Sequence, residues 1–333
     1  MPTVLVMGAG NIGCWLGGRL QAAGAQVHLV GRPRMLQALT DHGLTLTDLD
    51  GGQLALAANQ LVLHSSVPEA LRPDLVLLCV KSGATSAAAA ELARCMPAGT
   101  PVLSMQNGIG NTGLAQAAAP ALAVLPGMVP FNVAELGPGR LHRGSSGQLA
   151  VLTHPLLLPW ADAFNAAGLP LALHDDMLPL LWGKLLLNLN NAVNALSGLP
   201  LRAQLLDADY RACTAALISE ALFLLKTAGI RPARLGGTRP RMLPTVLRLP
   251  TPLFRLAAWR LLRIDDKARS SMADDLQRHR PTEIDAIQGE VLRLAGKLGQ
   301  LAPVNARTTQ LVKAWSPGRP PLSGRSMRKF LNV

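Results

Sequence analysis

The first half of the chain alternates short, mostly apolar runs with stretches rich in Ala and Gly. The apolar runs predict buried strands at residues 3–7, 26–30, 75–80 and 102–105. Between them, residues 12–23 and 86–95 have the composition of helices. Nearly continuous apolar strands are typical of a parallel sheet with helices on both faces, because neither face then meets water. The pattern therefore predicts an α/β fold for this half.

Two further segments alternate apolar and polar residues. Residues 44–63 contain a Gly51-Gly52 turn, which predicts a hairpin inserted in the sheet. Residues 137–153 alternate again, with turns at 137–139 and 144–147.

The pattern changes near residue 175. Beyond it the periodicity is helical, and it predicts helices at 178–196, 209–228, 252–263 and 283–298. Residues 231–252 are rich in Pro, Gly and Arg and predict a loop between helices. Strands that alternate with helices, followed by helices alone, indicate an α/β domain over residues 1–175 and an all-α domain over residues 176–333.

Composition excludes several classes of protein. The 333 residues are 49% hydrophobic and 16% charged, which is incompatible with a largely disordered chain. No run reaches the ~18–20 apolar residues of a membrane span, and no basic region precedes the first apolar run as in a signal peptide. The four cysteines form no CxxC pair, so we expect no metal site and no disulfide framework. We expect a cytoplasmic protein with reduced thiols.

The net charge of +12 is concentrated in residues 231–280, which hold 12 Lys and Arg against 4 Asp and Glu. A basic stretch can bind nucleic acid, but its aromatic residues are Phe254 and Trp259 alone, and no nucleic-acid motif is present. We therefore expect no nucleic-acid partner. A solvated helical face, or a field that attracts an anionic substrate and cofactor, explains the charge better.

A GxGxxG motif follows the first predicted strand directly and consists of Gly8, Ala9, Gly10, Asn11, Ile12 and Gly13. In this context the first glycine permits the turn, the second lets the backbone approach a pyrophosphate, and the third lets the helix pack on the strand. The phosphate would lie at the helix N-terminus, where unpaired N–H groups and the helix dipole favour an anion. The motif predicts dinucleotide binding, with a glycine-rich turn without a ligand as the alternative.

The end of the second predicted strand distinguishes NAD from NADP. An NAD site usually has Asp or Glu there, which bonds the ribose 2′-hydroxyl. Here the strand ends in Val30-Gly31-Arg32, with Arg34 two positions later and no carboxylate nearby in the sequence to repel a phosphate. Because a guanidinium pairs well with a 2′-phosphate, Arg32 predicts NADP; a mere surface cation is the alternative.

Two more predicted strands end in polar residues. Lys81 follows the strand at 75–80, and Asn107 follows the strand at 102–105. Ligands of open α/β sheets bind outside the carboxyl ends of the strands, so we expect both residues to face the cofactor. A solvated strand end and a plain turn are the alternatives.

The predicted helix at 178–196 is apolar nearly all round, which indicates a buried, central helix. It also contains one lysine and four asparagines, namely Lys184, Asn188, Asn190, Asn191 and Asn194. At about 100° per residue, Lys184, Asn188 and Asn191 form one stripe, whereas Asn190 and Asn194 point elsewhere. A lysine on a buried helix is costly unless it pairs or faces a cleft. The stripe suits binding of a carboxylate and a carbonyl oxygen; a structural network between helices is the alternative.

A helix-start signal follows at Pro281, Thr282 and Asp285, in the [ST]xx[DE] pattern. Glu283 would lie in the first turn, where pairing with the helix dipole alone could explain it.

Together these motifs resemble the ketopantoate reductase family. They occur in family order over most of the chain, as GAGNIG at 8–13, Arg32, VKS at 80–82, QNG at 106–108, WGKLLLNLNN at 182–191, ARSSMADDL at 268–276 and RPTEIDAIQGEV at 280–291. The resemblance implies a Rossmann-type NADP-binding domain, a helical substrate domain, and an active site in the cleft between them. It also implies NADPH-dependent reduction of ketopantoate, a small 2-oxo acid, to pantoate in pantothenate synthesis.

The resemblance also implies roles for individual residues. Lys184 would be the proton donor, Asn188 and Ser271 would bind substrate, and Glu283 would lie by the reacting centre and the nicotinamide. On the cofactor side, the resemblance implies that Lys81 and Asn107 lie near the nicotinamide ribose. It implies a further contact with the cofactor for Asn132.

One position departs from the family pattern. The family often has a second asparagine eight residues after the lysine, where this chain has Ala192. Asn191 or Asn194 could replace it, and the helical wheel favours Asn191 as a substrate contact. A reductase of another 2-oxo acid and a non-catalytic NADP-binding module are the alternative functions. The sequence is also compatible with a homodimer.

Overall fold

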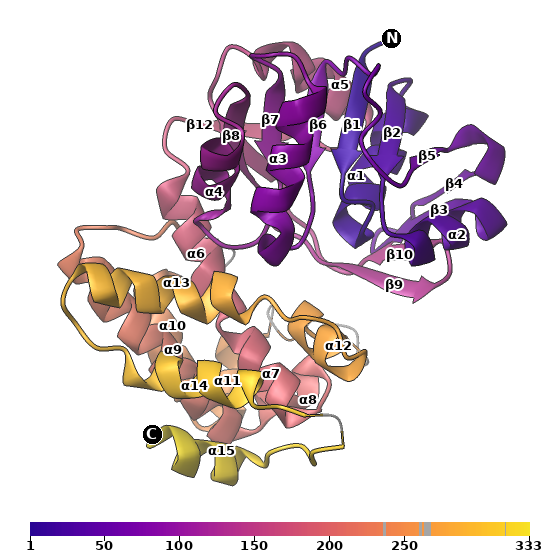
Figure 1. The fold of residues 1–333 in the computed structure, drawn as a ribbon. Helices are drawn as coiled ribbons and strands as arrows, with labels where there is room; N and C mark the ends of the chain where they lie inside the picture. Colours follow the sequence, from indigo (N-terminus) through magenta and orange to yellow (C-terminus); the bar gives the residue numbers. More distant parts are fainter. Residues whose placement is uncertain (236–237, 260–261, 263–267, 317) are drawn as a thin grey trace. The chain divides into compact units, whose positions relative to one another are not determined.

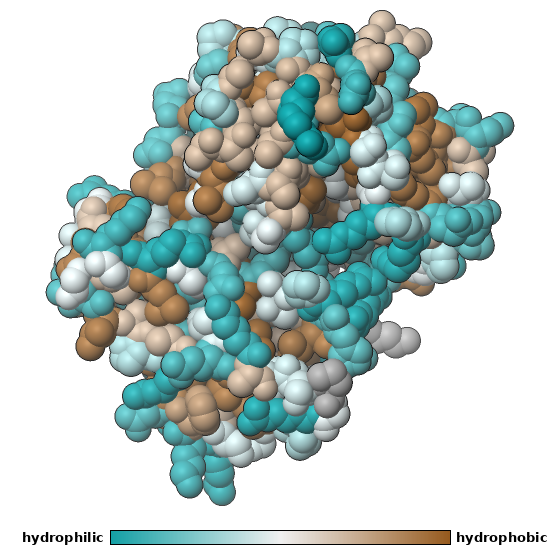
Figure 2. Space-filling model, viewed as in Figure 1, coloured by the Kyte–Doolittle hydropathy of each residue, from teal (hydrophilic) through white to brown (hydrophobic). Residues whose placement is uncertain are grey.

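The computed structural model describes residues 1–235, 238–259, 262, 268–316 and 318–333. The chain divides into two compact units, Met1–Met177 and Leu178–Val333 (Figure 1). Apolar side chains fill the interior of each unit, and scattered apolar groups reach the surface in Figure 2, as is usual for folded proteins. Among the described residues, no helix is long and apolar enough to cross a membrane.

The first unit is built on an eight-stranded sheet of order β12-β11-β8-β7-β6-β1-β2-β5. Its strands are β1 (Thr3–Met7), β2 (Gln26–Val30), β5 (Val62–His64), β6 (Leu75–Leu78), β7 (Pro101–Ser104), β8 (Ala123–Met128), β11 (Leu149–Leu152) and β12 (Leu171–His174). All neighbours are parallel except β8 and β11, which are antiparallel. The carboxyl ends of β1, β2, β6 and β7 therefore lie along one edge of the sheet.

Helices cover both faces of this sheet. On one face, α1 (Asn11–Ala22) and α5 (Ala161–Ala166) enclose a core that contains Val4, Val6 and Trp15. On the other face, α3 (Thr85–Cys95) and α4 (Asn111–Ala118) enclose a core that contains Leu5 and Val76. The helix α2 (Pro33–His42) follows β2, and short 3-10 turns lie at Ala58–Gln60, Ser82–Ala84 and Leu158–Trp160.

The predicted hairpin at 44–63 does form, but its predicted insertion in the main sheet is wrong. Its strands β3 (Leu44–Asp48) and β4 (Gln53–Leu56) belong to a separate four-stranded sheet of order β4-β3-β10-β9. The partners β9 (Val133–Gly137) and β10 (Arg140–Arg143) come from the second alternating segment. Alternating strands keep one polar face, which suits a sheet packed on one side only.

Among its described residues, the second unit has helices and connecting segments but no strand. Its helices are α6 (Leu178–Asn188), α7 (Asn190–Ser197), α8 (Leu201–Leu206), α9 (Ala208–Thr227), α10 (Leu243–Leu247), α11 (Thr251–Ala257), α12 (Ser271–Gln277), α13 (Ile284–Lys297), α14 (Pro303–Lys313) and α15 (Gly324–Leu331). The long helix α9 packs against α10, α14 and α15. The predicted fold class, a parallel-sheet domain followed by an all-α domain, is confirmed.

Three predicted elements of this unit differ in detail. The helix predicted at 178–196 is divided at Leu189, although the backbone there stays right-handed helical (φ −57°, ψ −27°). The loop predicted at 231–252 contains a 3-10 turn at Pro240–Met242 and α10, since proline is favoured in the first turn of a helix. The helix predicted at 252–263 is represented by α11, and residues 260, 261 and 263 lie outside the described residues.

Candidate functional site

In the glycine loop after β1, close packing excludes a side chain at two of the three glycines, and open space lies beside the third. Gly8 has φ +113°, and a Cβ there would lie 2.6 Å from the backbone nitrogen of Val80. A Cβ on Gly13 would overlap the carbonyl oxygen of Gly8. A Cβ on Gly10, in contrast, would meet nothing within 4 Å. Space beside the backbone of Gly10 is what the approach of a pyrophosphate needs, so the loop fits a dinucleotide.

The helix α1 begins inside this motif, at Asn11. No side chain caps its N-terminus, and its first turn has no acidic residue. The N–H groups of this turn and the helix dipole therefore favour an anion. The side chain of Asn11 is already engaged, since its Nδ2 donates to the carbonyl oxygen of Val133 in β9 at 3.0 Å.

Two arginines stand at the start of α2, and the structure separates their roles. Arg32 is exposed and its side chain makes no hydrogen bond or ion pair with any described residue. Arg34 forms a two-pronged ion pair with Glu135, with Nη1–Oε1 2.8 Å and Nη2–Oε2 3.1 Å. This hydrogen bond raises the pKa of Arg34 above its ordinary value. In three dimensions a carboxylate does lie beside Arg34, because β9 brings Glu135 from a hundred residues away along the chain.

The loops after β6 and β7 are joined by a buried hydrogen-bond network. The Nε2 of Gln106 donates to the Thr85 hydroxyl at 2.7 Å and to the Val80 carbonyl at 2.9 Å. The Nδ2 of Asn111 donates to the Ser82 hydroxyl at 3.1 Å. Thr85, Gln106 and Asn111 are all buried. The network fixes the two loops against each other.

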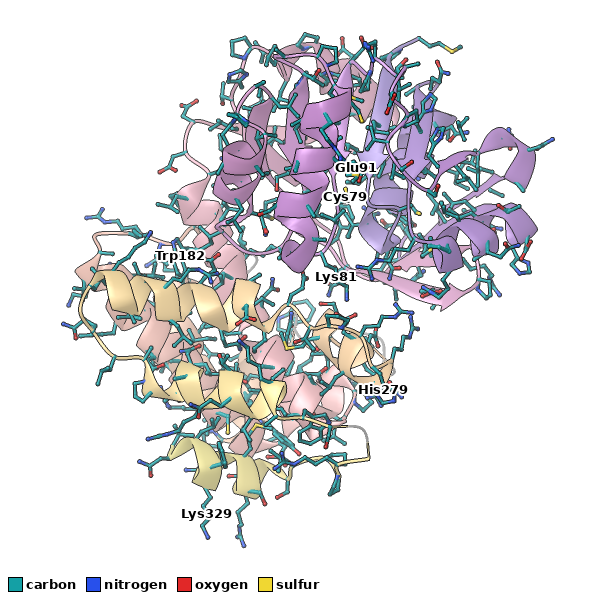
Figure 3. The ribbon with its side chains drawn as sticks, viewed as in Figure 1. Cys79, Lys81, Glu91, Trp182, His279 and Lys329 are labelled. Atoms are coloured by element: carbon teal, nitrogen blue, oxygen red, sulfur yellow. The ribbon has the colours of Figure 1, made fainter. Side chains whose placement is uncertain are left out.

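Lys81 and Asn107 belong to these two loops. The Ser82 hydroxyl donates to the carbonyl oxygen of Asn107 at 3.2 Å, so the segments of the predicted cofactor residues are in contact. Lys81 lies at this carboxyl edge of the first unit (Figure 3). Sequence reasoning missed Thr85 and Asn111; the available signal was a cluster of polar residues directly behind two strand ends.

Asn132 lies between β8 and β9 and is exposed. Its backbone N–H donates to the Ser145 hydroxyl at 2.9 Å.

Within the described part of the chain, no group of three or more His, Cys, Asp or Glu could hold a metal ion.

In the second unit, Lys184 lies on the apolar helix α6 and is half-buried. Burial lowers the pKa of its ammonium to about 8, while the negative charge of Glu283 acts in the opposite direction. Glu283 directly precedes α13 and is also half-buried. The fold thus brings these two groups within electrostatic reach although they are far apart in sequence.

The four asparagines of α6 and α7 divide into two kinds. Asn190 is bonded on both sides of its amide, since its Oδ1 accepts from Thr214 at 2.7 Å and its Nδ2 donates to Gln204 at 3.1 Å. Asn194 is fully buried; its Nδ2 donates to the Leu199 carbonyl at 2.9 Å, and its Oδ1 accepts the Ser270 N–H at 3.0 Å.

Asn188 and Asn191 are half-buried, and their side chains make no hydrogen bond with a described residue. They are therefore the amides with capacity for a ligand, and of the pair Asn191 and Asn194 the geometry favours Asn191. The neighbouring Ser271 is exposed at the start of α12.

Two buried residues that sequence reasoning missed hold these elements together. Ser270 caps α12 by accepting the Ala273 N–H at 3.2 Å, and its own hydroxyl donates to the Asn191 carbonyl at 3.2 Å. Gln288 of α13 donates to the carbonyl of Leu189, between α6 and α7, at 3.0 Å. These contacts fix α12 and α13 against the helix that bears the polar stripe.

Comparison with known proteins extends over both units. Two sequence models of ketopantoate reductases (PanE/ApbA) match the chain, the general one at residues 4–154 and the C-terminal one at residues 176–316. The 2-dehydropantoate 2-reductase of Pyrococcus horikoshii is 28% identical, over 93% of this chain and 96% of that protein.

Two solved structures are similar as well. A PanE/ApbA family ketopantoate reductase from Ralstonia eutropha has a TM-score of 0.78 at 29% identity, over 93% of this chain and 97% of that chain. A D-mandelate dehydrogenase in complex with NADH and anilino(oxo)acetate has a TM-score of 0.77 and covers 99% of both chains. At 21% identity the latter likeness shows the fold alone.

Proposed function

The chain belongs to the ketopantoate reductase family, and we propose that it reduces ketopantoate to pantoate with NADPH, as a step of pantothenate biosynthesis. One observation carries the proposal: Lys184 is a half-buried ammonium on an apolar helix, with a pKa lowered to about 8 and the carboxylate of Glu283 within electrostatic reach. Reduction of a ketone needs a positive charge and a proton at its oxygen, and such a lysine supplies both near neutral pH.

The first unit would hold the cofactor, which supplies a hydride when bound. The open space at Gly10 and the uncapped N-terminus of α1 support a pyrophosphate on the loop of residues 8–13. The uncommitted guanidinium of Arg32 supports recognition of the 2′-phosphate, hence NADP rather than NAD. Lys81, Asn107 and Asn132 complete the proposed cofactor contacts.

The second unit would hold the keto acid and move the proton. Lys184 would donate the proton of its Nζ to the carbonyl oxygen of the keto acid, and its charge would stabilise the developing alkoxide. The neutral amine then regains a proton from solvent. Glu283 opposes the effect of burial on Lys184 and keeps it charged, and it bonds the substrate hydroxyl beside the nicotinamide.

Substrate orientation would depend on groups with unused hydrogen-bonding capacity. Asn188 and Asn191 on the stripe, and Ser271 at the start of α12, would bind the polar groups of the keto acid. The commitment of Asn190 and Asn194 to other partners supports this choice.

The test is oxidation of NADPH, followed by its absorbance, with ketopantoate and a panel of linear, branched and aromatic 2-oxo acids. We expect the highest kcat/KM for ketopantoate and a lower value with NADH. A higher kcat/KM for another 2-oxo acid would reassign the substrate and keep the chemistry. No oxidation with any acid would refute the reductase and favour a non-catalytic NADP-binding module.

A further inference from the structure

The strand β9 contacts both segments that the proposed function assigns to the cofactor. At the glycine loop, Val133 accepts the hydrogen bond of the Asn11 amide at 3.0 Å. At the start of α2, Glu135 accepts both hydrogen bonds of Arg34, at 2.8 and 3.1 Å. Three consecutive residues of β9, from Val133 to Glu135, thus contact both the helix start after β1 and the segment after β2.

Glu135 is the buried partner of this pair. Its side chain is 9% exposed, whereas that of Arg34 is 55% exposed. Two residues before it on the same face, Val133 packs against the core that contains Cys14 of α1. The charge of Glu135 reaches this helix: burial, and secondarily Glu135, raise the pKa of the Cys14 thiol to about 12. The carboxylate therefore acts on the helix whose N-terminus is proposed to hold a pyrophosphate.

A buried carboxylate beside an anion site has no evident benefit for stability. A carboxylate without a partner would repel the cofactor, and an ion pair whose arginine is exposed adds little to the stability of the fold. Arg34 neutralises the carboxylate, so one of the two arginines at the start of α2 is already engaged. Arg32, two residues earlier, stays uncommitted.

We propose that the Arg34–Glu135 pair sets the preference between NADPH and NADH. Glu135 withholds Arg34 from the 2′-phosphate, so that Arg32 binds it alone and the affinity for NADPH is held below what two arginines would give. NADH lacks this phosphate, so the affinity for NADH should hardly depend on the Arg34–Glu135 pair. The inference rests on the proposed function only in placing the nicotinamide cofactor on the glycine loop.

The test is titration of NADPH and of NADH into the full chain at low ionic strength, followed by nicotinamide fluorescence without any keto acid. Glu135→Gln releases Arg34, and one added unit charge near the phosphate should tighten NADPH binding by about three- to tenfold. Arg34→Gln removes the positive charge that Arg34 places beside the carboxylate and should weaken NADPH binding by about five- to thirtyfold. The affinity for NADH should change by less than about twofold in both variants.

The double variant Arg34→Gln/Glu135→Gln guards against a folding defect, because it removes both charges together and leaves two neutral amides. Its affinity for NADPH should return to within about twofold of wild type. A matched control is Asp74→Asn, which changes the net charge as Glu135→Gln does. Asp74 accepts the N–H of Thr3 and precedes β6, at the amino-terminal edge of the sheet. It should leave the affinity for NADPH unchanged.

Two outcomes would overturn the inference. Weaker NADPH binding in Glu135→Gln would mean that Glu135 presents Arg34 to the phosphate, and unchanged binding would mean that the pair is structural. In both cases NADPH still binds, and the proposed function stands. Binding of neither cofactor by the wild-type chain would contradict both proposals together.

Discussion

Buried polar side chains behind β6 and β7 hydrogen-bond to one another, whereas two asparagines of α6 and α7 keep unused hydrogen-bonding capacity. At the sheet edge, Thr85, Gln106 and Asn111 are buried and bonded to one another and to backbone groups. On the helices, Asn188 and Asn191 stay half-buried with unused hydrogen-bonding capacity. Buried groups with full sets of partners fix the shape of a site, whereas partly exposed groups with spare capacity are available to a ligand.

Lys184→Ala should give the sharpest contrast between groups that act on a ligand and groups that only fix the shape of the site. Loss of a general acid typically lowers the rate by ~10²–10⁴-fold, and we expect a fall of this size in kcat. The affinity for NADPH should stay near wild type, because the glycine loop and Arg32 of the first unit are untouched. Pre-steady-state kinetics and a fluorescence titration on one preparation measure both quantities.

The same preparation separates catalysis from stability. If Lys184 is only a buried core cation, the variant should change its melting temperature while the folded fraction turns over normally. Glu283→Ala should also lower turnover, and the double variant should lose less than the product of the two single losses if the residues act as a unit.

Arg32→Asp probes the cofactor side. It removes the uncommitted cation and places a carboxylate beside the 2′-phosphate. Loss of a charge-assisted hydrogen bond costs ~1.5–3 kcal/mol, so the affinity for NADPH should fall about ten- to more than a hundredfold. The affinity for NADH should change far less. Equal dissociation constants of variant and parent for NADPH would show that Arg32 is a plain surface residue.

The pH dependence tests the proton donor. Because burial lowers the pKa of Lys184 to about 8, the protonated form is lost as pH rises through that value. The kcat/KM for reduction should therefore be level below that pH and fall about tenfold per unit above it. Glu283→Gln removes the charge that raises this pKa, so the fall should begin at lower pH. A profile that stays level well into the alkaline range would exclude Lys184 as the acid.

Asn190 and Asn191 form a matched pair of neighbours with opposite roles. Asn190→Ala leaves Thr214 and Gln204 without their partner and should lower the free energy of unfolding by about 1–3 kcal/mol, with KM little changed. Asn191→Ala should raise KM for the keto acid by about tenfold and leave the melting temperature unchanged. Chemical denaturation and steady-state kinetics on both variants measure the contrast; a shared phenotype would remove the distinction.

The features that depend on neighbours in sequence could be predicted. The glycine loop lies between a strand and a helix, and Gly8 has the positive φ that its position in the turn requires. The helical wheel separated Asn190 and Asn194 from the stripe, although the helix is divided at Leu189. The strand β8 was not predicted, because Pro126 and Gly127 lie inside it and both residues normally argue against a central strand.

The features that depend on distant partners could not be predicted. Arg34 looked as available as Arg32 until β9 brought Glu135 to it. The roles of Ser270 and Gln288 depend on contacts with Asn194 and Leu189, which lie tens of residues away along the chain. Periodicity and local motifs contain no information on such pairs, which the tertiary fold alone creates.

Transfer of deuterium to ketopantoate from NADPH with deuterium at both hydrogen positions of the nicotinamide C4 tests the central claim most directly. The wild-type chain should form pantoate with one deuterium at C2, detected by mass spectrometry of the product. Lys184→Ala should form the same labelled product at a rate lower by ~10²–10⁴-fold. Unlabelled pantoate, no pantoate at all, or equal rates for the two proteins would contradict the account.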